Sequence, residues 1–202
     1  MTAGQHKEQI ADSTRAVQLR PSDPSFYKFR ADALAMAGNF EEAIDDCTRA
    51  IQLQPNNPER YIDRAKLYQQ AKNYSAALAD CQRALDMADQ NDIVLTGRQT
   101  RDGVKFQAWQ ARGDIFYETR EWSRALFEYD KALAVVPNNS YRRMILPQRA
   151  RVYVRLGRLD AVTAEVEQIR TIAPEIERSL LAAVRYETAK MRFENQTGRI
   201  LN

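Results

Sequence analysis

Glycine, proline, cysteine and histidine are scarce in this chain, which has 7 Gly, 7 Pro, 2 Cys and 1 His among its 202 residues. So few glycines and prolines leave too little turn chemistry for a β-sandwich, and the composition favours long helices. The two cysteines lack C-x-x-C spacing, which argues against a disulfide scaffold and against the common zinc and redox motifs. The single histidine, His6, leaves no base for a Ser/His/Asp or Cys/His catalytic set. Glycine-rich phosphate loops are absent as well. We therefore expect no catalytic residues, no metal ligands and no cofactor, and predict that the protein is not an enzyme.

Long apolar runs are also missing, because charged residues interrupt every apolar stretch before it reaches the ~18 residues of a membrane span. Residues 1–11 show no hydrophobic segment of a secretory signal. The sequence therefore predicts a soluble protein without a membrane span, and we expect it to be cytoplasmic.

Charge is nearly balanced overall, with 30 Lys and Arg against 27 Asp and Glu, but it is unevenly distributed. Up to Ser140 the chain has 18 basic and 20 acidic residues, and from Tyr141 onward it has 12 basic and 7 acidic. Residues 141–158 contain no Asp or Glu and six arginines: Arg142, Arg143, Arg149, Arg151, Arg155 and Arg158. Any electrostatic preference for a partner should therefore lie at this end of the chain.

An internal repeat dominates the sequence. Residues 38–58 align with residues 72–92 at a shift of 34 residues, and residues 120–139 and 157–174 continue the pattern after two insertions. When the four repeats are aligned, each set of equivalent positions forms a column. Three columns hold Ala or Gly at ten of their twelve positions: Ala31, Ala65, Gly113, Ala150; Ala43, Ala77, Ala125, Val162; Ala50, Ala84, Ala132, Ile169. Larger residues flank them: Tyr27, Tyr61, Trp109, Leu146; Phe40, Tyr74, Trp122, Leu159. Small side chains at a fixed period allow antiparallel helices to approach closely while larger ones fill the gaps.

In period and columns, the sequence resembles the tetratricopeptide repeat family, whose unit is a helix–turn–helix. The resemblance implies an all-α, right-handed α-solenoid of about ten helices that forms a single domain over residues 1–202. It divides as follows: a leading half-repeat helix at 5–23, repeats at 24–57 and 58–91, an insertion at 92–105, repeats at 106–139 and 143–176, and a C-terminal capping helix at 177–195. The chain thus starts in mid-repeat, either with a cap or as a fragment of a longer array.

Local signals support this division. Asp23 and Asn57 each precede a proline, as N-caps do, and Gly38 with Asn39 should end one helix and cap the next. The insertion should be a loop broken by Gly97 and Gly103, or an extension of the preceding helix and a candidate contact element. A helix that starts near Leu146 would accommodate Pro147, whereas an earlier start would be kinked. Cys47 and Cys81 occupy one column and should be separate buried thiols.

The resemblance also implies a concave groove that receives a protein or peptide partner. We expect the groove to include ten residues: Lys28, Asp32, Asp63, Lys66, Gln70, Asp114, Glu118, Arg151, Arg155 and Arg158. A subset of the family binds chaperone tails through a carboxylate clamp, whose positions here hold Lys28, Asp32, Asp63, Gln107 and Ala111. Only Lys28 matches, and the two aspartates would repel a carboxylate, so we do not expect chaperone-tail binding.

Our first hypothesis is therefore a non-enzymatic scaffold or adaptor, whose partner carries acidic residues that meet the arginines of the fourth repeat. We expect Arg151, Arg155 and Arg158 to be exposed, because their i, i+4, i+7 spacing puts them on one helical face. The alternative for this face is a solvated surface without a partner. Two further alternatives are nucleic-acid binding through residues 142–158 and self-association through the open N-terminal half-repeat, which would give a homo-oligomer.

Overall fold

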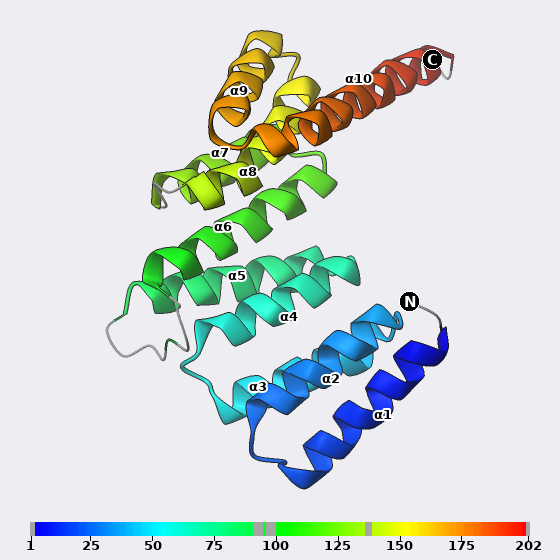
Figure 1. The fold of residues 1–202 in the computed structure, drawn as a ribbon, viewed down its shortest axis with the longest axis vertical. Coiled ribbons are helices and arrows are strands. Elements are labelled where there is room, and N and C mark those ends of the chain that lie inside the picture. Colours follow the sequence, from blue (N-terminus) through cyan, green and yellow to red (C-terminus); the bar gives the residue numbers. More distant parts are fainter. Residues whose placement is uncertain (1–2, 91–94, 96–99, 136–138, 201–202) are drawn as a thin grey trace. The chain divides into compact units, whose positions relative to one another are not determined.

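A computed structural model of the chain describes residues 3–90, 95, 100–135 and 139–200, and within them the regular structure is entirely helical (Figure 1). The described helices are α1 Ala3–Leu19, α2 Pro24–Met36, α3 Phe40–Leu53, α4 Pro58–Gln70, α5 Tyr74–Ala88, α6 Arg101–Glu118, α7 Trp122–Val135, α8 Asn139–Arg155, α9 Leu159–Ile172, the short 3-10 helix Pro174–Ile176, and α10 Glu177–Ile200. This all-helical, serial arrangement agrees with the fold class that the sequence predicts.

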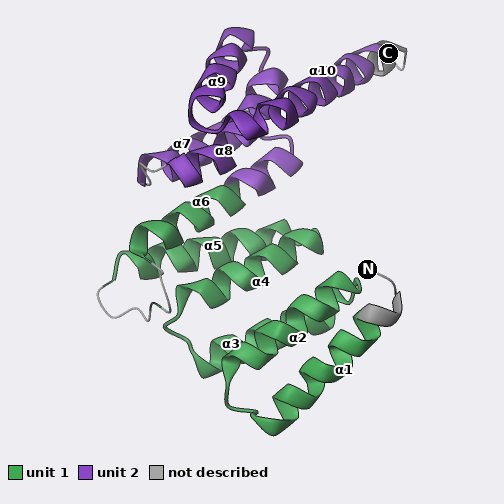
Figure 2. Cartoon of the chain, viewed as in Figure 1, with its two compact units in different colours: residues 1–112 green, residues 113–202 purple. Residues whose placement is uncertain are grey.

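The chain forms two compact units, residues 1–112 (unit 1) and residues 113–202 (unit 2), with the boundary inside α6 (Figure 2). In unit 1 each helix from α1 to α5 packs on the next one along the chain. In unit 2, α7 packs on α8 and α8 on α9, and α10 packs on both α8 and α9. Apart from α10, which packs mainly on α8, these helices contact their neighbours in sequence, as in repeat proteins.

Side-chain caps start α2 and α4 where the sequence predicts them, whereas Asn39, the expected cap of α3, makes no side-chain cap hydrogen bond. Asp23 Oδ1 accepts a hydrogen bond from the Ser25 amide at 3.0 Å, and Asn57 Oδ1 accepts one from the Glu59 amide at 3.0 Å. In both helices a proline follows the cap, where its missing N–H is not needed. The capping role of the two residues is therefore confirmed.

The turns inside the four helix pairs share one backbone conformation. Gly38, Lys72, Arg120 and Gly157 all have positive φ, between 60° and 86°. After each of them the next amide donates a hydrogen bond to a carbonyl five residues back, for example Asn39 N–H to Leu34 at 2.9 Å and Asn73 N–H to Tyr68 at 2.8 Å. This is the Schellman pattern of helix ends, so the repeat is visible in the backbone as well as in the side chains.

The small-residue columns lie at the helix contacts. Ala31, Ala65, Ala77 and Ala125 are at most 1% exposed. Ala31 and Ala43 pack with Leu34, Cys47 and Leu67 in one cluster of unit 1, and a second cluster joins α4, α5 and α6 around Ala84 and Ala108. The expectation that these alanines are buried is confirmed. Leu159 is an exception among the larger residues, because it is 62% exposed and does not fill a gap as the sequence suggests.

Helix α6 begins earlier than expected, at Arg101, so the last part of the predicted insertion is helical. Gly103 does not break a helix. Its amide instead donates to Thr100 Oγ1 at 3.0 Å, so that Thr100 caps the first turn. The preceding helix ends at Ala88. Half of the insertion, including Gly97, lies outside the described residues, as does Pro137.

Helix α8 also begins early, at Asn139, and holds Pro147 in its interior. The expectation that the helix starts near Leu146 is therefore wrong. The proline removes one helical N–H donor, which leaves the Arg143 carbonyl without its usual partner. The apolar residues around it compensate, because Ile145, Leu146 and Ala150 are each fully buried.

Candidate interaction surfaces

Unit 1 contains an open groove of about 520 Å³ between the first helices of its two complete pairs, α2 and α4. Five residues that the sequence predicts for a groove line it: Lys28, Asp32, Asp63, Lys66 and Gln70. Met36 and Leu67 add apolar surface, and Met36 is 46% exposed. The structure therefore brings these five residues together on one surface that combines both signs of charge with an exposed thioether.

The charged side chains of this groove differ in whether they have hydrogen-bond partners. Lys28 Nζ donates to Asp32 Oδ2 at 2.7 Å, and both groups are partly exposed. Asp63 is mostly buried, its Oδ2 accepts no hydrogen bond within the described residues, and Arg60 Nη1 lies 3.6 Å away. Burial raises the pKa of Asp63 to about 6, although Lys28 and Lys66 oppose the shift. Asp63 Oδ2 is thus an enclosed acceptor beside Arg60, and a donor from a partner would reach it only after the side chain rotates.

Cys47 lies behind the same groove as a free, buried thiol, and Cys81 is likewise free and buried. Burial raises the pKa of Cys47 to about 12. A thiol with so high a pKa is a poor nucleophile, so Cys47 contributes packing to the groove and not reactivity.

An ion pair ties together the two helices of each repeat in unit 1. The Arg30 guanidinium on α2 donates to both carboxylate oxygens of Asp46 on α3, at 2.7 and 2.6 Å. Arg64 on α4 holds Asp80 on α5 in the same bidentate way, at 2.8 and 2.8 Å. Such pairs fix the relative orientation of two helices, because both partners are directional and largely buried. They thereby position the groove-lining faces of α2 and α4.

These ion pairs follow a further periodic signal of the sequence, which the small-residue columns do not reveal. An arginine followed 16 residues later by an acid recurs in all four repeats: Arg30 and Asp46, Arg64 and Asp80, Arg112 and Glu128, Arg149 and Glu165. In unit 2 the Arg149 Nη2 atom lies 3.2 Å from Glu165. The small-residue columns indicate apolar contacts, whereas these two positions of the repeat, 16 residues apart, hold a cation and an anion that pair.

The predicted site residues of unit 2 are partly covered by the chain's own helix α10. Arg155, which we expected to be exposed, has a side chain only 5% exposed beneath α10 and pairs with both Glu187 and Glu194. Arg151 is partly covered by Glu187, whereas Arg158 is exposed. The expectation for Arg155 is wrong because the acidic partner of this arginine comes from the chain's own C-terminal helix.

Asp114 and Glu118 complete the predicted set. Asp114 Oδ1 accepts a hydrogen bond from the Tyr129 hydroxyl at 2.6 Å, which commits one of its oxygens to the interior of the repeat. Glu118, the last residue of α6, is exposed.

The arginine-rich segment is largely neutralised within unit 2. Four of its six arginines lie within ion-pair distance of carboxylates: Arg143 with Glu175, Arg149 with Asp130 and Glu165, Arg151 with Glu187, and Arg155 with Glu187 and Glu194. Phosphate binding gains most from uncompensated positive charge, so these pairs weaken the case for nucleic-acid recognition through this segment.

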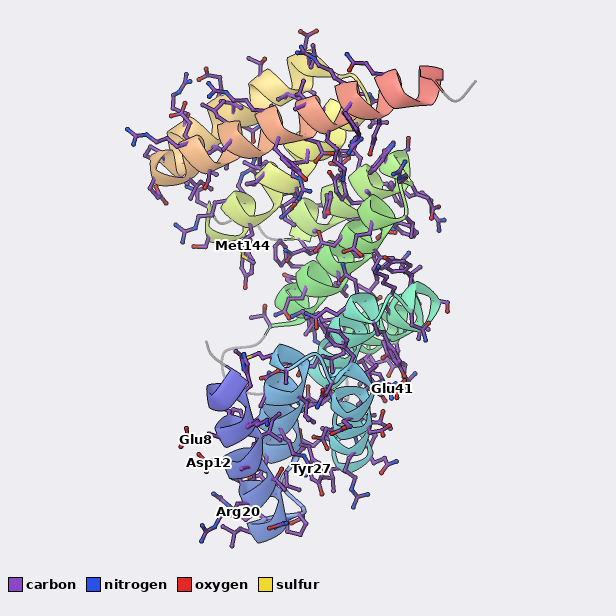
Figure 3. The ribbon with its side chains drawn as sticks, turned by 90° about the vertical axis from the view of Figure 1, so that its right-hand side faces the viewer. Glu8, Asp12, Arg20, Tyr27, Glu41 and Met144 are labelled. Atoms are coloured by element: carbon purple, nitrogen blue, oxygen red, sulfur yellow. The ribbon has the colours of Figure 1, made fainter. Side chains whose placement is uncertain are left out.

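Helix α1 shows little support for self-association through an apolar edge. Its apolar residues Ile10 and Val17 pack against α2 and α3, whereas Glu8, Asp12 and Arg15 are exposed. Glu8 and Asp12 point away from the rest of unit 1 (Figure 3). The exposed part of α1 is therefore mainly charged but includes Leu19, which is 73% exposed, and self-association stays an untested prediction.

Across the part of the chain that the structure describes, no three His, Cys, Asp or Glu side chains are grouped so that they could hold a metal ion. In the same residues no helix is long and apolar enough to span a membrane.

Serial helix pairs with shared turns, small residues at their contacts and an open groove define an α-helical repeat protein of the interaction-scaffold class. Two models of the tetratricopeptide repeat match the chain, one over residues 9–58 and the other over residues 40–100. Residues 9–100 therefore carry tetratricopeptide repeats, as the sequence columns indicate. Proteins of this family generally mediate protein–protein interactions and are generally not enzymes.

Solved structures of similar fold support this assignment. A tetratricopeptide repeat protein from Parabacteroides merdae is 16% identical, with a TM-score of 0.66 over 97% of this chain and 72% of its own. The MamA protein is 14% identical, with a TM-score of 0.60 over 87% and 86%. The first tetratricopeptide domain of Spaghetti (RPAP3), bound to the HSP90 peptide SRMEEVD, is 21% identical, with a TM-score of 0.52 over 67% and 94%. At these identities the likeness concerns the fold alone. Curated protein sequences gave no match.

Proposed function

We propose that the protein is a scaffold or adaptor whose unit 1 groove binds an extended segment of a partner protein. The observation that carries the proposal is the open groove lined by Lys28, Asp32, Asp63, Lys66 and Gln70, with the buried, unsatisfied Asp63 Oδ2 beside it. An extended segment has free backbone N–H groups and projecting side chains, which suit an open groove lined by charged, amide and apolar side chains.

The charge of the groove favours donors over carboxylates in the bound segment. Asp32 and Asp63 lie where the chaperone-tail clamp needs neutral amides, and Lys28 is already paired with Asp32. The Spaghetti domain holds a peptide that ends in MEEVD. We propose that the groove of this chain selects a different segment, with a basic side chain near Asp32 and Asp63 and an apolar one against Met36.

The sequence also suggests that acidic residues of a partner meet Arg151, Arg155 and Arg158. Arg155 is already paired with Glu187 and Glu194, so an acidic segment would have to replace α10 at that position. Arg158 is exposed and remains part of this proposal as a contact for an acidic residue of the partner.

Selection from a random 12-residue peptide library displayed on phage, with the full chain as bait, tests the groove. We expect the selected peptides to be enriched in Lys or Arg next to an apolar residue. Their affinity should fall at least tenfold with Asp32→Lys, because the substitution places a cation where the partner brings one.

Asp12→Lys is the matched control, since it makes the same charge change on the exposed face of α1. Equal loss with both variants, or no loss with Asp32→Lys, would show that peptides bind outside the groove.

A further inference from the structure

Helix α10 covers, in unit 2, the surface that corresponds to the open groove of unit 1. Arg151 and Arg155 on α8 stand at the ninth and thirteenth positions of their repeat. In unit 1 the same positions hold Asp32 and Met36 on α2, and Lys66 and Gln70 on α4, all of which line the groove. The equivalent face of α8 packs instead against α10. Helix α10 therefore lies over the residues of α8 whose repeat equivalents line the open groove of unit 1.

The surface under α10 is built for carboxylates. Arg155 donates from Nε to Glu187 and from Nη1 to Glu194 Oε2, the latter at 2.5 Å. Arg151 Nε lies 3.6 Å from the second oxygen of Glu187, which is fully buried. One arginine thus receives two glutamates that are seven residues apart on one helix face.

Aromatic rings support both arginines from the other side. The Arg151 guanidinium lies 4.5 Å from the centre of the Tyr117 ring, and that of Arg155 lies 5.2 Å from Trp122. The two rings contact each other edge to face at 5.2 Å. Stacking on aromatic faces orients a guanidinium and reduces its contact with water, so its pairing with a carboxylate becomes stronger. These four side chains form a defined anion site and not a loose basic patch.

The two halves of α10 are attached differently. Near its N-terminus, Leu180, Leu181 and Val184 join a cluster with Leu146, Ala150, Val166 and Ile169. Further along, the attachment runs through Glu187 and Glu194, while Tyr186 on the opposite side is 65% exposed. The apolar half therefore anchors the helix, and the acidic half occupies the arginine site.

We propose that Arg151, Arg155, Tyr117 and Trp122 form a binding site for an acidic helix that presents two glutamates seven residues apart. The acidic half of α10 is the resident occupant, and the corresponding helix of a partner protein displaces it. Because α10 is tethered to its site, its effective concentration there is high. The apparent affinity for a partner is therefore reduced by the fraction of molecules in which α10 has left the arginine site. This site is separate from the groove of unit 1 and does not depend on it.

A labelled synthetic peptide of residues 177–200 serves as the probe, measured by fluorescence anisotropy with the full chain. We expect weak binding to the wild type, because α10 competes. The double variant Glu187→Gln/Glu194→Gln should bind the peptide at least tenfold more tightly, since its own helix no longer fills the anion site. Adding Arg155→Gln to this double variant should lower its affinity for the peptide at least tenfold. A peptide in which both glutamates are replaced by Gln should bind the double variant no more tightly than it binds the wild type.

Hydrogen exchange provides the second measurement, with amides of residues 187–196 expected to exchange at least tenfold faster in the double variant. Glu8→Gln/Asp12→Asn, on exposed positions of α1, is the matched control and should leave both readouts unchanged. If Arg155→Gln prevents folding, Arg151→Gln replaces it.

Three results would overturn the proposal. The first is that the wild type and the double variant bind the peptide with equal affinity and that the amides of α10 exchange equally slowly in both. This result would make α10 a permanent part of the core. The second is peptide binding that does not depend on the arginines. The third is sedimentation of the wild type as a dimer that exchanges α10, which would make a second copy of the chain the occupant.

Discussion

Gly113 and Tyr129 show how one change of volume is compensated within a single repeat. The other three repeats hold alanine at the position of Gly113, facing Cys47, Cys81 or Val166 at the position of Tyr129. A Cβ atom on Gly113 would lie 2.4 Å from Tyr129 Cε1. The Tyr129 ring is 1% exposed and its hydroxyl is bound to Asp114, so the ring has no room to move. Glycine is therefore required by the tyrosine that it faces.

Gly113→Ala should destabilise the protein by about 1–3 kcal/mol, the usual cost of overpacking. Adding Tyr129→Cys gives the alanine and cysteine combination of the first two repeats and relieves the overpacking. The double variant should therefore lose less stability than the sum of the losses of the two single variants. Urea unfolding followed by circular dichroism measures this. Wild-type stability for Gly113→Ala would show that the ring can shift.

Asp63 predicts a pH dependence of stability. Its pKa is raised from 3.8 to about 6, chiefly by burial, with Glu59 adding to the shift and Lys28, Lys66 and Arg60 opposing it. Between these two values the folded protein binds more protons than the unfolded chain, so this group's contribution to stability falls as the pH rises from about 4 to about 6. Ionised Asp63 therefore destabilises the fold at neutral pH.

Asp63→Asn should be more stable than the wild type above pH 6, by at most about 3 kcal/mol for a two-unit shift, and the difference should vanish below about pH 4. Thermal unfolding across this range measures it. Asp32→Asn is the control, because it makes the same substitution at an exposed position of the same groove. A constant difference at all pH values would contradict the assignment to Asp63.

At the scale of helices, the bidentate pairs decide how the two helices of a repeat are oriented. Arg64 and Asp80 join α4 to α5 with side chains that are 18% and 9% exposed. Burial makes the removal of one partner costly, because the other charge is left without a partner. The exposed pair Lys28–Asp32 within α2 should contribute far less, because water screens it.

Asp80→Asn should therefore cost about 2–4 kcal/mol, whereas Asp32→Asn should stay within about 1 kcal/mol of the wild type. Chemical denaturation of both variants under the same conditions compares the two. Similar losses would mean that burial does not govern the strength of these pairs.

Much at this scale could be predicted from the sequence. Caps such as Asp23 and Asn57 act through residues two positions away, so local spacing reveals them. The start of α6 could not be placed in this way, because Gly103 is a poor helix former and its place in the helix is supported by the Thr100 cap and by the burial of Val104. The exposure of Leu159 likewise depends on which neighbouring surfaces cover it.

At the scale of the whole chain, serial packing predicts local effects of core substitutions. Ala77 on α5 is fully buried, and Ala77→Leu should overpack the contact of α5 with α4 at a cost of about 1–3 kcal/mol. Since each helix packs mainly on its neighbours, hydrogen exchange should accelerate in α4 and α5 much more than in α8 and α9. Uniform acceleration throughout the chain would contradict this independence.

The sequence by itself determined the helical repeat, its register and the first half of the candidate site. The small columns recur at a fixed period, and Lys28, Asp32, Asp63, Lys66 and Gln70 follow from that register without further information. Periodic patterns are local in origin, because each repeat buries its apolar face against the next by the same geometry.

Only the tertiary structure decided what happens to the arginines of the last repeat. Glu187 and Glu194 lie 32 and 39 residues beyond Arg155, outside the repeating columns, and their pairing depends on where α10 packs. No local spacing encodes that position, since it results from the apolar cluster around Leu180 and from the burial of two charges against each other. The same column of residues therefore lines an open groove in unit 1 and lies beneath the chain's own helix in unit 2.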